Sequence, residues 1–170
     1  PRPFRRIVAC VDFSETAQEV VKHALRVAGQ DQAELHFLHV FQAEWNNWSS
    51  RAHLAALADF EKGYRVILEN NLRQFAAATP ETPAIYSVTQ AKTHGHGIAE
   101  YCRSVDADLV ILGTRGRTTL KYILLGSTVE RLLKEIPCSA LVVRPPTETG
   151  SAMARQADAA SGGREAAVQV

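Results

Sequence analysis

Two glycines and a glycine-serine pair form the most suggestive cluster of residues in the sequence. Gly113 and Gly116 follow an apolar run, and Gly126 and Ser127 precede the next amphipathic stretch. Glycine lets backbone N–H groups approach a bulky anion, and a helix N-terminus supplies unpaired donors with partial positive charge. Cationic side chains lie between the two pairs at Arg115, Arg117 and Lys121. The spacing therefore predicts a phosphate cradle between residues 113 and 127.

Simpler interpretations exist for two of these side chains. Ser127 and Glu130 have the spacing of a capping box, in which the serine only begins a helix. Capping and phosphate binding can coexist at one serine. Arg115 is either a solvated loop charge or a phosphate contact, and the same two interpretations apply to Arg117.

A carboxylate after the first apolar run is a second candidate for ligand binding. Asp12 directly follows Val11. It either caps the next helix or contacts a ribose, a base or a magnesium-bound water beside the phosphates. Neither Asp12 nor Ser127 has a partner that would make it a general base or an activated nucleophile. The glycine signatures of dinucleotide-binding folds and of P-loop enzymes are also absent. These residues predict binding rather than turnover.

The histidines and cysteines are interpreted as structural residues rather than as metal ligands or disulfide partners. His94-Gly-His96 has no third metal ligand nearby and is expected in a loop. His36 and His39 have opposite strand parity, so they do not share one face. Three cysteines at wide spacing fit neither a disulfide framework nor a zinc site. Cys10 and Cys138 lie in apolar runs and are interpreted as small buried hydrophobes, which suits a reducing compartment.

Five short apolar runs must position these residues. They are nearly continuous and rich in β-branched residues, which is typical of strands buried on both faces. The runs are Ile7–Val11, Leu35–Phe41, Ala84–Val88, Leu109–Leu112 and Ala140–Val143. Helical patterns separate them, so the order βαβαβαβαβ predicts an α/β fold: an open, doubly wound, five-stranded parallel sheet with helices on both faces. Its ligands would bind beyond the carboxyl ends of the strands.

The helix limits follow from their end signals. In the first helix, Ser14 is the expected N-cap, and Gly29 stands where a C-terminal glycine belongs. The second helix is expected over residues 52–78, and the third is short. The fourth begins at Ser127 and ends before Pro137.

Composition places the chain among ordinary globular proteins. It has 170 residues, 46% of them hydrophobic, and a formal net charge of +1. Such a balance of charge does not predict nucleic-acid binding, which needs an excess of positive charge. No apolar run is long enough to span a membrane. Residues 1–146 are expected to form one domain. Residues 147–170, rich in alanine, glycine and serine, are expected to form a flexible tail. We expect a cytoplasmic protein without an export signal.

Four segments together resemble the universal stress protein family. The first is the motif Gly-x2-Gly-x9-Gly-Ser, formed here by Gly113, Gly116, Gly126 and Ser127. The others are VDFSETA after the first strand, LHV in the second and PCSALVVR at the fifth. The resemblance covers roughly residues 4–146 and implies the strand order 3-2-1-4-5, an adenine nucleotide α-hydrolase-like arrangement. The glycine motif marks the ATP-binding branch of that family.

Site residues follow from the resemblance position by position. Val11 and Asp12 would line the nucleoside end, and the backbone of Val40 would meet adenine. Gly113 and Gly116 would wrap ribose and phosphate, with Arg115 between them. The phosphates would lie against Gly126, Ser127 and Thr128. Members of the family often have a glycine after the third strand, where this chain has Gln90, Ala91 and Lys92.

The resemblance implies a cytoplasmic regulatory protein that binds ATP, with or without Mg²⁺. Nucleotide occupancy would tune a homodimer formed through the fifth strand, or an interaction with a protein partner of unknown identity, in a stress response. Such a protein is not an enzyme beyond slow ATP hydrolysis at most. Two alternatives stay open: an ATPase or phosphotransferase, and an interaction module that works without nucleotide.

Overall fold

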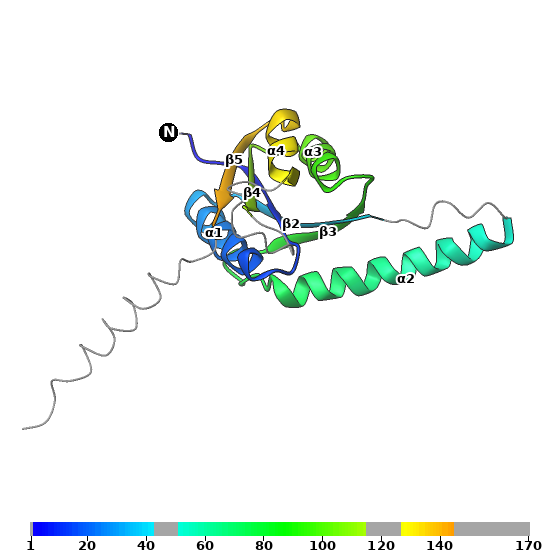
Figure 1. Cartoon of the computed structure of the whole chain (residues 1–170). Coiled ribbons are helices and arrows are strands. Elements are labelled where there is room, and N and C mark those ends of the chain that lie inside the picture. The colour runs from blue at the N-terminus through cyan, green and yellow to red at the C-terminus, as the bar shows by residue number, and fades with distance from the viewer. Residues whose placement is uncertain (1, 43–50, 115–126, 145–170) are drawn as a thin grey trace, which may run out of the picture.

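A parallel sheet with helices on both faces organises the chain, as a computed structural model describing residues 2–42, 51–114 and 127–144 shows (Figure 1). The elements are, in order, β1 (Arg6–Cys10), α1 (Glu15–Asp31), β2 (Glu34–Phe41), α2 (Arg51–Phe75), β3 (Ala84–Gln90), α3 (His94–Ser104), β4 (Leu109–Gly113), α4 (Ser127–Glu135) and β5 (Ser139–Val143). The strand order is β3-β2-β1-β4-β5, with parallel pairing throughout. The predicted fold class and strand order are confirmed.

The strands lie where the apolar runs predict them, within one or two residues at each end. Burial explains why the prediction works. In the central strands β1 and β4, side chains on both faces are fully buried, among them Val8, Ala9, Val110 and Ile111. Strands covered on both sides need continuous apolar sequence rather than alternation.

Two hydrophobic cores lie on opposite faces of the sheet. On one face, α1 and α2 pack over Ile7, Phe37 and Ile111. On the other face, α3 and α4 pack over residues such as Val8 and Val110. Figure 1 shows the two pairs of helices on opposite sides of the sheet. Because each helix returns from the end of one parallel strand to the start of the next, α1, α3 and α4 all begin at the carboxyl edge of the sheet.

The ends of α1 confirm one expectation and correct another. Ser14 is the N-cap, and its side chain accepts a hydrogen bond from the N–H of Ala17. The predicted C-terminal role of Gly29 is wrong, because the helix continues to Asp31 and Gln32 takes the left-handed conformation with φ of 53°. Gly29 is small for a different reason: a Cβ there would lie 3.3 Å from Thr82 Oγ1.

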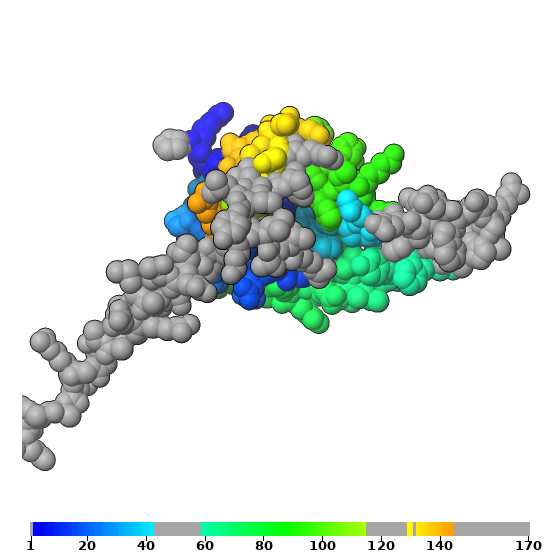
Figure 2. All heavy atoms as spheres, in the orientation of Figure 1, coloured from blue at the N-terminus to red at the C-terminus, as the bar shows by residue number. Residues whose placement is uncertain are grey.

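The C-terminal half of α2 packs closely against the sheet. Leu68, Leu72 and Ala76 are buried near this end, whereas the side chains of Phe60 and Ile67 are 58% and 57% exposed. The helix extends beyond the sheet in Figure 1, and its described part forms a ridge along the lower side of the space-filling view (Figure 2). None of the helices in the described ranges combines the length and apolar character needed to cross a bilayer.

Candidate functional site

Four of the predicted ligand-binding residues lie at the carboxyl edge of the sheet. Strand order reverses between β1 and β4, since the chain builds outward from β1 through β2 and β3 and then continues at β4. Connections that diverge at such a point leave a crevice in which open α/β sheets bind ligands. Val11 and Asp12 follow β1, Val40 lies near the end of β2, and Gly113 ends β4. The structure thus brings these four residues to one edge.

The turn after β1 is fixed by hydrogen bonds. The N–H of Val11 donates to the Leu38 carbonyl at 2.9 Å, so pairing with β2 continues one residue beyond β1. Asp12 Oδ1 accepts hydrogen bonds from the N–H of Ser14 at 3.1 Å and from its hydroxyl at 2.6 Å. Ser14, not Asp12, is therefore the cap, and Asp12 orients the cap. Both hydrogen bonds use the same carboxylate oxygen.

Phe13 occupies the strained position of this turn. Its φ is 63°, in the left-handed region, which is costly for a bulky side chain. The ring packs 4.7 Å from the His39 ring and 5.5 Å from the Phe75 ring, centroid to centroid. His39 also donates from Nδ1 to the Val11 carbonyl at 2.7 Å. Strained residues recur at functional sites. Sequence analysis missed Phe13, because glycine, asparagine and aspartate are the residues that signal this conformation.

Val40 meets α3 at very short range. A Cβ added to Gly97 would lie 2.7 Å from Val40 Cγ1 and 2.7 Å from Ala91 Cβ, so only glycine fits there. Thr93 caps this helix by accepting a hydrogen bond from the N–H of His96 at 3.3 Å. The predicted loop at His94-Gly-His96 is wrong, since these residues form the first turn of α3.

The glycine-rich segment is described at its two ends. Gly113 pairs with Val143, and the next residue, Thr114, is buried and donates its N–H to the Val143 carbonyl at 2.8 Å. Ser127 and Thr128 are the first residues of α4, which confirms the predicted start of this helix, and the capping role of the Ser127 side chain stays a prediction. Val129 of α4 packs in the same core as the end of β4. Arg115, Gly116 and Gly126 lie outside the described residues, as does the predicted tail over 147–170.

Other candidate side chains have structural partners. His36 is buried, with Nδ1 3.0 Å from the Tyr101 hydroxyl and Nε2 2.9 Å from a carboxylate oxygen of Glu34. His36 therefore has the predicted structural role. Cys10 and Cys138 are partly buried against the core under α3 and α4, and burial raises the pKa of the Cys10 thiol far above its ordinary value. Within the described ranges, no three metal-ligating side chains gather into a group.

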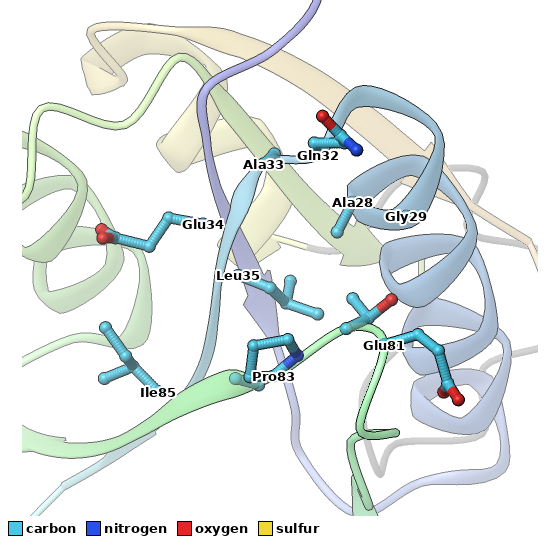
Figure 3. Close-up of a pocket in the computed structure, with 11 residues that line it drawn as sticks. Ala28, Gly29, Gln32, Ala33, Glu34, Leu35, Glu81, Pro83 and Ile85 are labelled. Atoms are coloured by element: carbon cyan, nitrogen blue, oxygen red, sulfur yellow. The ribbon is translucent and has the colours of Figure 1, made fainter.

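A cavity of about 470 Å³ lies at the opposite edge of the sheet (Figure 3). It is lined by the end of α1 and the starts of β2 and β3, with Gln32, Leu35 and Pro83 among its residues. None of the predicted nucleotide-binding residues lines it. The cavity and the candidate site thus occupy different edges of the sheet.

Comparison with known sequences decides the family. The sequence model of the universal stress protein family matches residues 3–144, which include every strand and helix described above. The chain belongs to the universal stress protein family. The match also includes the whole Gly113–Ser127 segment, so the predicted site lies inside the family domain.

Several universal stress proteins of known sequence or structure are similar to this family member. Universal stress protein MJ0531 of Methanocaldococcus jannaschii is 29% identical over 84% of this chain and 84% of its own length. YxiE of Bacillus subtilis is 25% identical over 83% and 99%. The solved structure of UspA from Lactobacillus plantarum has a TM-score of 0.66 and 26% identity, covering 85% of this chain and 99% of its own.

One further solved structure is a universal stress protein in complex with cAMP. It has a TM-score of 0.60 and 17% identity, and the match covers 85% of this chain and 99% of that one. At this identity the likeness extends to the fold. The cyclic nucleotide is a property of that protein.

Proposed function

We propose that this universal stress protein is a regulatory protein that binds an adenine nucleotide, ATP, at the carboxyl edge of its sheet. The observation that supports the proposal is the position of the two described ends of the glycine motif. Gly113 ends β4 and Ser127 begins α4 at the point where strand order reverses. A glycine-rich loop leading into a helix N-terminus suits a phosphate group. The cAMP complex of a protein with this fold supports an adenine nucleotide as the ligand class.

The proposed contacts form two groups along the carboxyl edge, one for the nucleoside and one for the phosphates. Val11, Asp12 and the backbone of Val40 would receive the nucleoside. Gly113, Arg115 and Gly116 would surround the ribose and the nearer phosphates. The remaining phosphates would lie against Gly126, Ser127 and Thr128 at the start of α4. When Mg²⁺ accompanies ATP, it supplies charge neutralisation for the phosphates.

Binding rather than turnover is the proposed activity. Two side chains that could move a proton, Asp12 after β1 and His39 near the end of β2, already have structural partners. Asp12 orients Ser14, and His39 Nδ1 donates to the Val11 carbonyl. Hydrolysis would then be slow at most. Nucleotide occupancy would instead alter how the protein pairs with a second copy or with a protein partner in the cytoplasm.

The proposed second copy pairs through β5. This strand is at one end of the strand order, and its Ser139 and Ala140 are exposed while Leu141 and Val142 are partly exposed. An apolar edge strand offers unpaired N–H and C=O groups to another chain. A symmetric homodimer would satisfy those groups by pairing β5 with itself.

The test is calorimetric titration of the purified, ligand-free protein with ATP and with adenosine, after mass spectrometry of any nucleotide released on denaturation. Gly126→Val should abolish ATP binding, because a β-branched side chain fills the cradle and restricts the backbone. Gly63→Val is the matched control, since a side chain at Gly63 would point into open space. Unchanged ATP affinity in folded Gly126→Val would remove Gly126 from the site.

Two outcomes would favour the alternatives. If no adenine nucleotide is retained or titrates, the protein is an interaction module that works without nucleotide. If single-turnover assays show hydrolysis or phosphoryl transfer well above background, the protein is an enzyme.

A further inference from the structure

His39 of β2 contacts the loop after β1 at two places. Its Nδ1 lies 2.7 Å from the Val11 carbonyl oxygen, and its ring centroid lies 4.7 Å from that of Phe13. Val11 is buried, and His39 and Phe13 are partly buried. One histidine of the neighbouring strand thus contacts both the residue before Asp12 and the residue after it.

Hydrogen bonds to β2 fix the backbone on both sides of Val11. A carbonyl oxygen can only accept, so Nδ1 of His39 carries a proton and donates it to the Val11 carbonyl. The N–H of Val11 donates to the Leu38 carbonyl at 2.9 Å. The two peptide planes that flank Val11 therefore cannot rotate without breaking one of these hydrogen bonds.

Ring contacts hold Phe13 in a backbone conformation that it would not adopt alone. Its φ of 63° is unfavourable for a bulky residue and persists where the surrounding structure enforces it. The His39 ring packs against Phe13, and Phe75 at the end of α2 meets it edge-on, with centroids 5.5 Å apart and ring planes at 89°. Loss of the His39 ring would let the loop relax toward a commoner conformation and would displace Asp12.

We propose that His39 is a positioning residue for the nucleoside end of the nucleotide site and that it acts through Val11 and Phe13. The inference rests on the proposed function, in which Val11 and Asp12 receive the nucleoside. With the residues on both sides of Asp12 held in place, this loop is ordered before a ligand arrives. Binding then does not have to supply the free energy of ordering it.

His36 provides an internal comparison on the same strand. It lies three residues before His39, so its side chain is on the opposite face of the sheet. There its Nδ1 lies 3.0 Å from the Tyr101 hydroxyl and its Nε2 lies 2.9 Å from Glu34. None of these partners belongs to the proposed nucleotide site. Replacing His36 should therefore lower stability without changing nucleotide affinity.

The test is calorimetric titration of full-length His39 variants with ATP and with adenosine. His39→Leu removes both the donor and the ring, and it should weaken the binding of both ligands by the same factor, about threefold to tenfold. An equal loss assigns the defect to the nucleoside end, because a defect at the phosphate end would spare adenosine. His39→Asn should bind both ligands more tightly than His39→Leu, since its amide nitrogen is as many bonds from the backbone as Nδ1 and keeps a donor for Val11.

The controls separate this role from general stability and from the proposed function. His36→Gln should be less stable in thermal unfolding and should bind both ligands as wild type does. If His39→Leu does not fold, His39→Phe, which keeps a ring and lacks the donor, makes the same comparison.

Two results would overturn the positioning role while the proposed function stands. One is a folded His39→Leu, or its replacement His39→Phe, with wild-type affinity for both ligands. The other is an equal loss of affinity in His36→Gln. A wild-type protein that binds neither ligand would instead overturn the proposed function, and this inference with it.

Discussion

At the scale of single residues, the carboxyl edge depends on a few short contacts that leave little room for change. Asp12 orients Ser14, Ser14 caps α1, and Phe13 is fixed between two rings in a left-handed conformation. Gly97 lets α3 approach Val40. Each of these contacts positions backbone groups rather than a reactive side chain, which agrees with binding as the proposed function.

Ser127 can be tested as a ligand separately from its predicted role as a cap. Ser127→Asp should keep α4 intact, because aspartate is as good an N-cap as serine. ATP binding should weaken, because the carboxylate repels the phosphates and the hydroxyl donor is lost. Adenosine binding should change far less. The measurements are calorimetric titration with both ligands and thermal unfolding without ligand.

Ser127→Ala is the complementary variant. Losing the cap should cost about 0.5–2 kcal/mol of stability, with only partial loss of ATP affinity. If Ser127→Asp binds ATP as tightly as wild type, the serine acts as a cap alone, and the phosphates must lie nearer Gly113 and Gly116.

Gly97→Ala should destabilise the protein. Overpacking at a site where the added Cβ lies 2.7 Å from Val40 and Ala91 costs about 1–3 kcal/mol, which outweighs the gain of about 1 kcal/mol in helix propensity. Displacing Val40 should also weaken nucleotide binding. Gly63→Ala is the matched control: its Cβ meets nothing within 4 Å, so stability should rise by about 0.5–1 kcal/mol. Chemical denaturation of both variants measures the difference, and a stabilised Gly97→Ala would contradict the packing argument.

At the scale of elements, a polar chain links three strands, β1, β2 and β3, to α3 on one face of the sheet. Glu34 of β2 contacts Arg6 of β1 at 2.8 Å and His36 at 2.9 Å. His36 continues to the Tyr101 hydroxyl of α3, which lies 2.6 Å from Ser87 Oγ of β3. The described residues contain no buried side-chain nitrogen or oxygen without a partner. This chain explains how a histidine can lie inside the sheet.

The same chain predicts an acid-dependent loss of stability. Hydrogen bonds from His36 and Arg6 lower the pKa of Glu34 below its ordinary value of 4.5. A carboxyl group with a lowered folded-state pKa stabilises the protein above 4.5, and this contribution disappears as pH falls through the lower value. Wild type should therefore lose its stability advantage over Glu34→Gln within that window. The measurement is the free energy of unfolding against pH.

Glu81→Gln is the control for this effect, because it removes an exposed carboxylate at the same edge of the sheet. The difference in the free energy of unfolding between wild type and Glu81→Gln should not shrink as the pH falls through this window. A constant difference between wild type and Glu34→Gln across the window would contradict the assigned role of Glu34.

Element limits were predictable where local chemistry decides them and unpredictable where tertiary packing does. Ser14 is the N-cap of α1 and α4 begins at Ser127, both as expected, since the sequence signals for a helix start lie within one turn of it. Gly29 wrongly predicted the end of α1. A Cβ at this position would crowd Thr82, and Gln32 is the residue that takes the left-handed conformation at the end of the helix. Phe13 and Gly97 escaped prediction for the same reason: their roles depend on neighbours far away in sequence.

At the scale of the whole molecule, assembly through β5 can be tested with one backbone change. The N–H and C=O groups of one strand residue point to the same side, and successive residues alternate. Since Ser139 donates to the Asp108 carbonyl and the Val143 carbonyl accepts from Thr114, these alternate residues face β4. Val142 therefore directs its N–H away from β4. Val142→Pro should break the dimer without removing a bond inside the sheet.

Light scattering at micromolar concentration measures the outcome. Wild type should have the mass of two chains and Val142→Pro the mass of one, with an unchanged circular dichroism spectrum. Val142→Thr keeps the N–H and serves as the control, so it should remain dimeric. A monomeric wild type would contradict pairing through β5.

The polarity of the sheet has a practical consequence for tethering the protein. Residues 2–5 lead into β1 at the amino edge, while the proposed nucleotide site is at the carboxyl edge. With five residues in β1 at about 3.3 Å each, roughly 16 Å of strand separates the two edges. A surface anchor or fluorophore attached before β1 would therefore leave the proposed site facing solution. The same label attached after β5 would follow Val143, at the carboxyl edge, where it would obstruct the proposed nucleotide site.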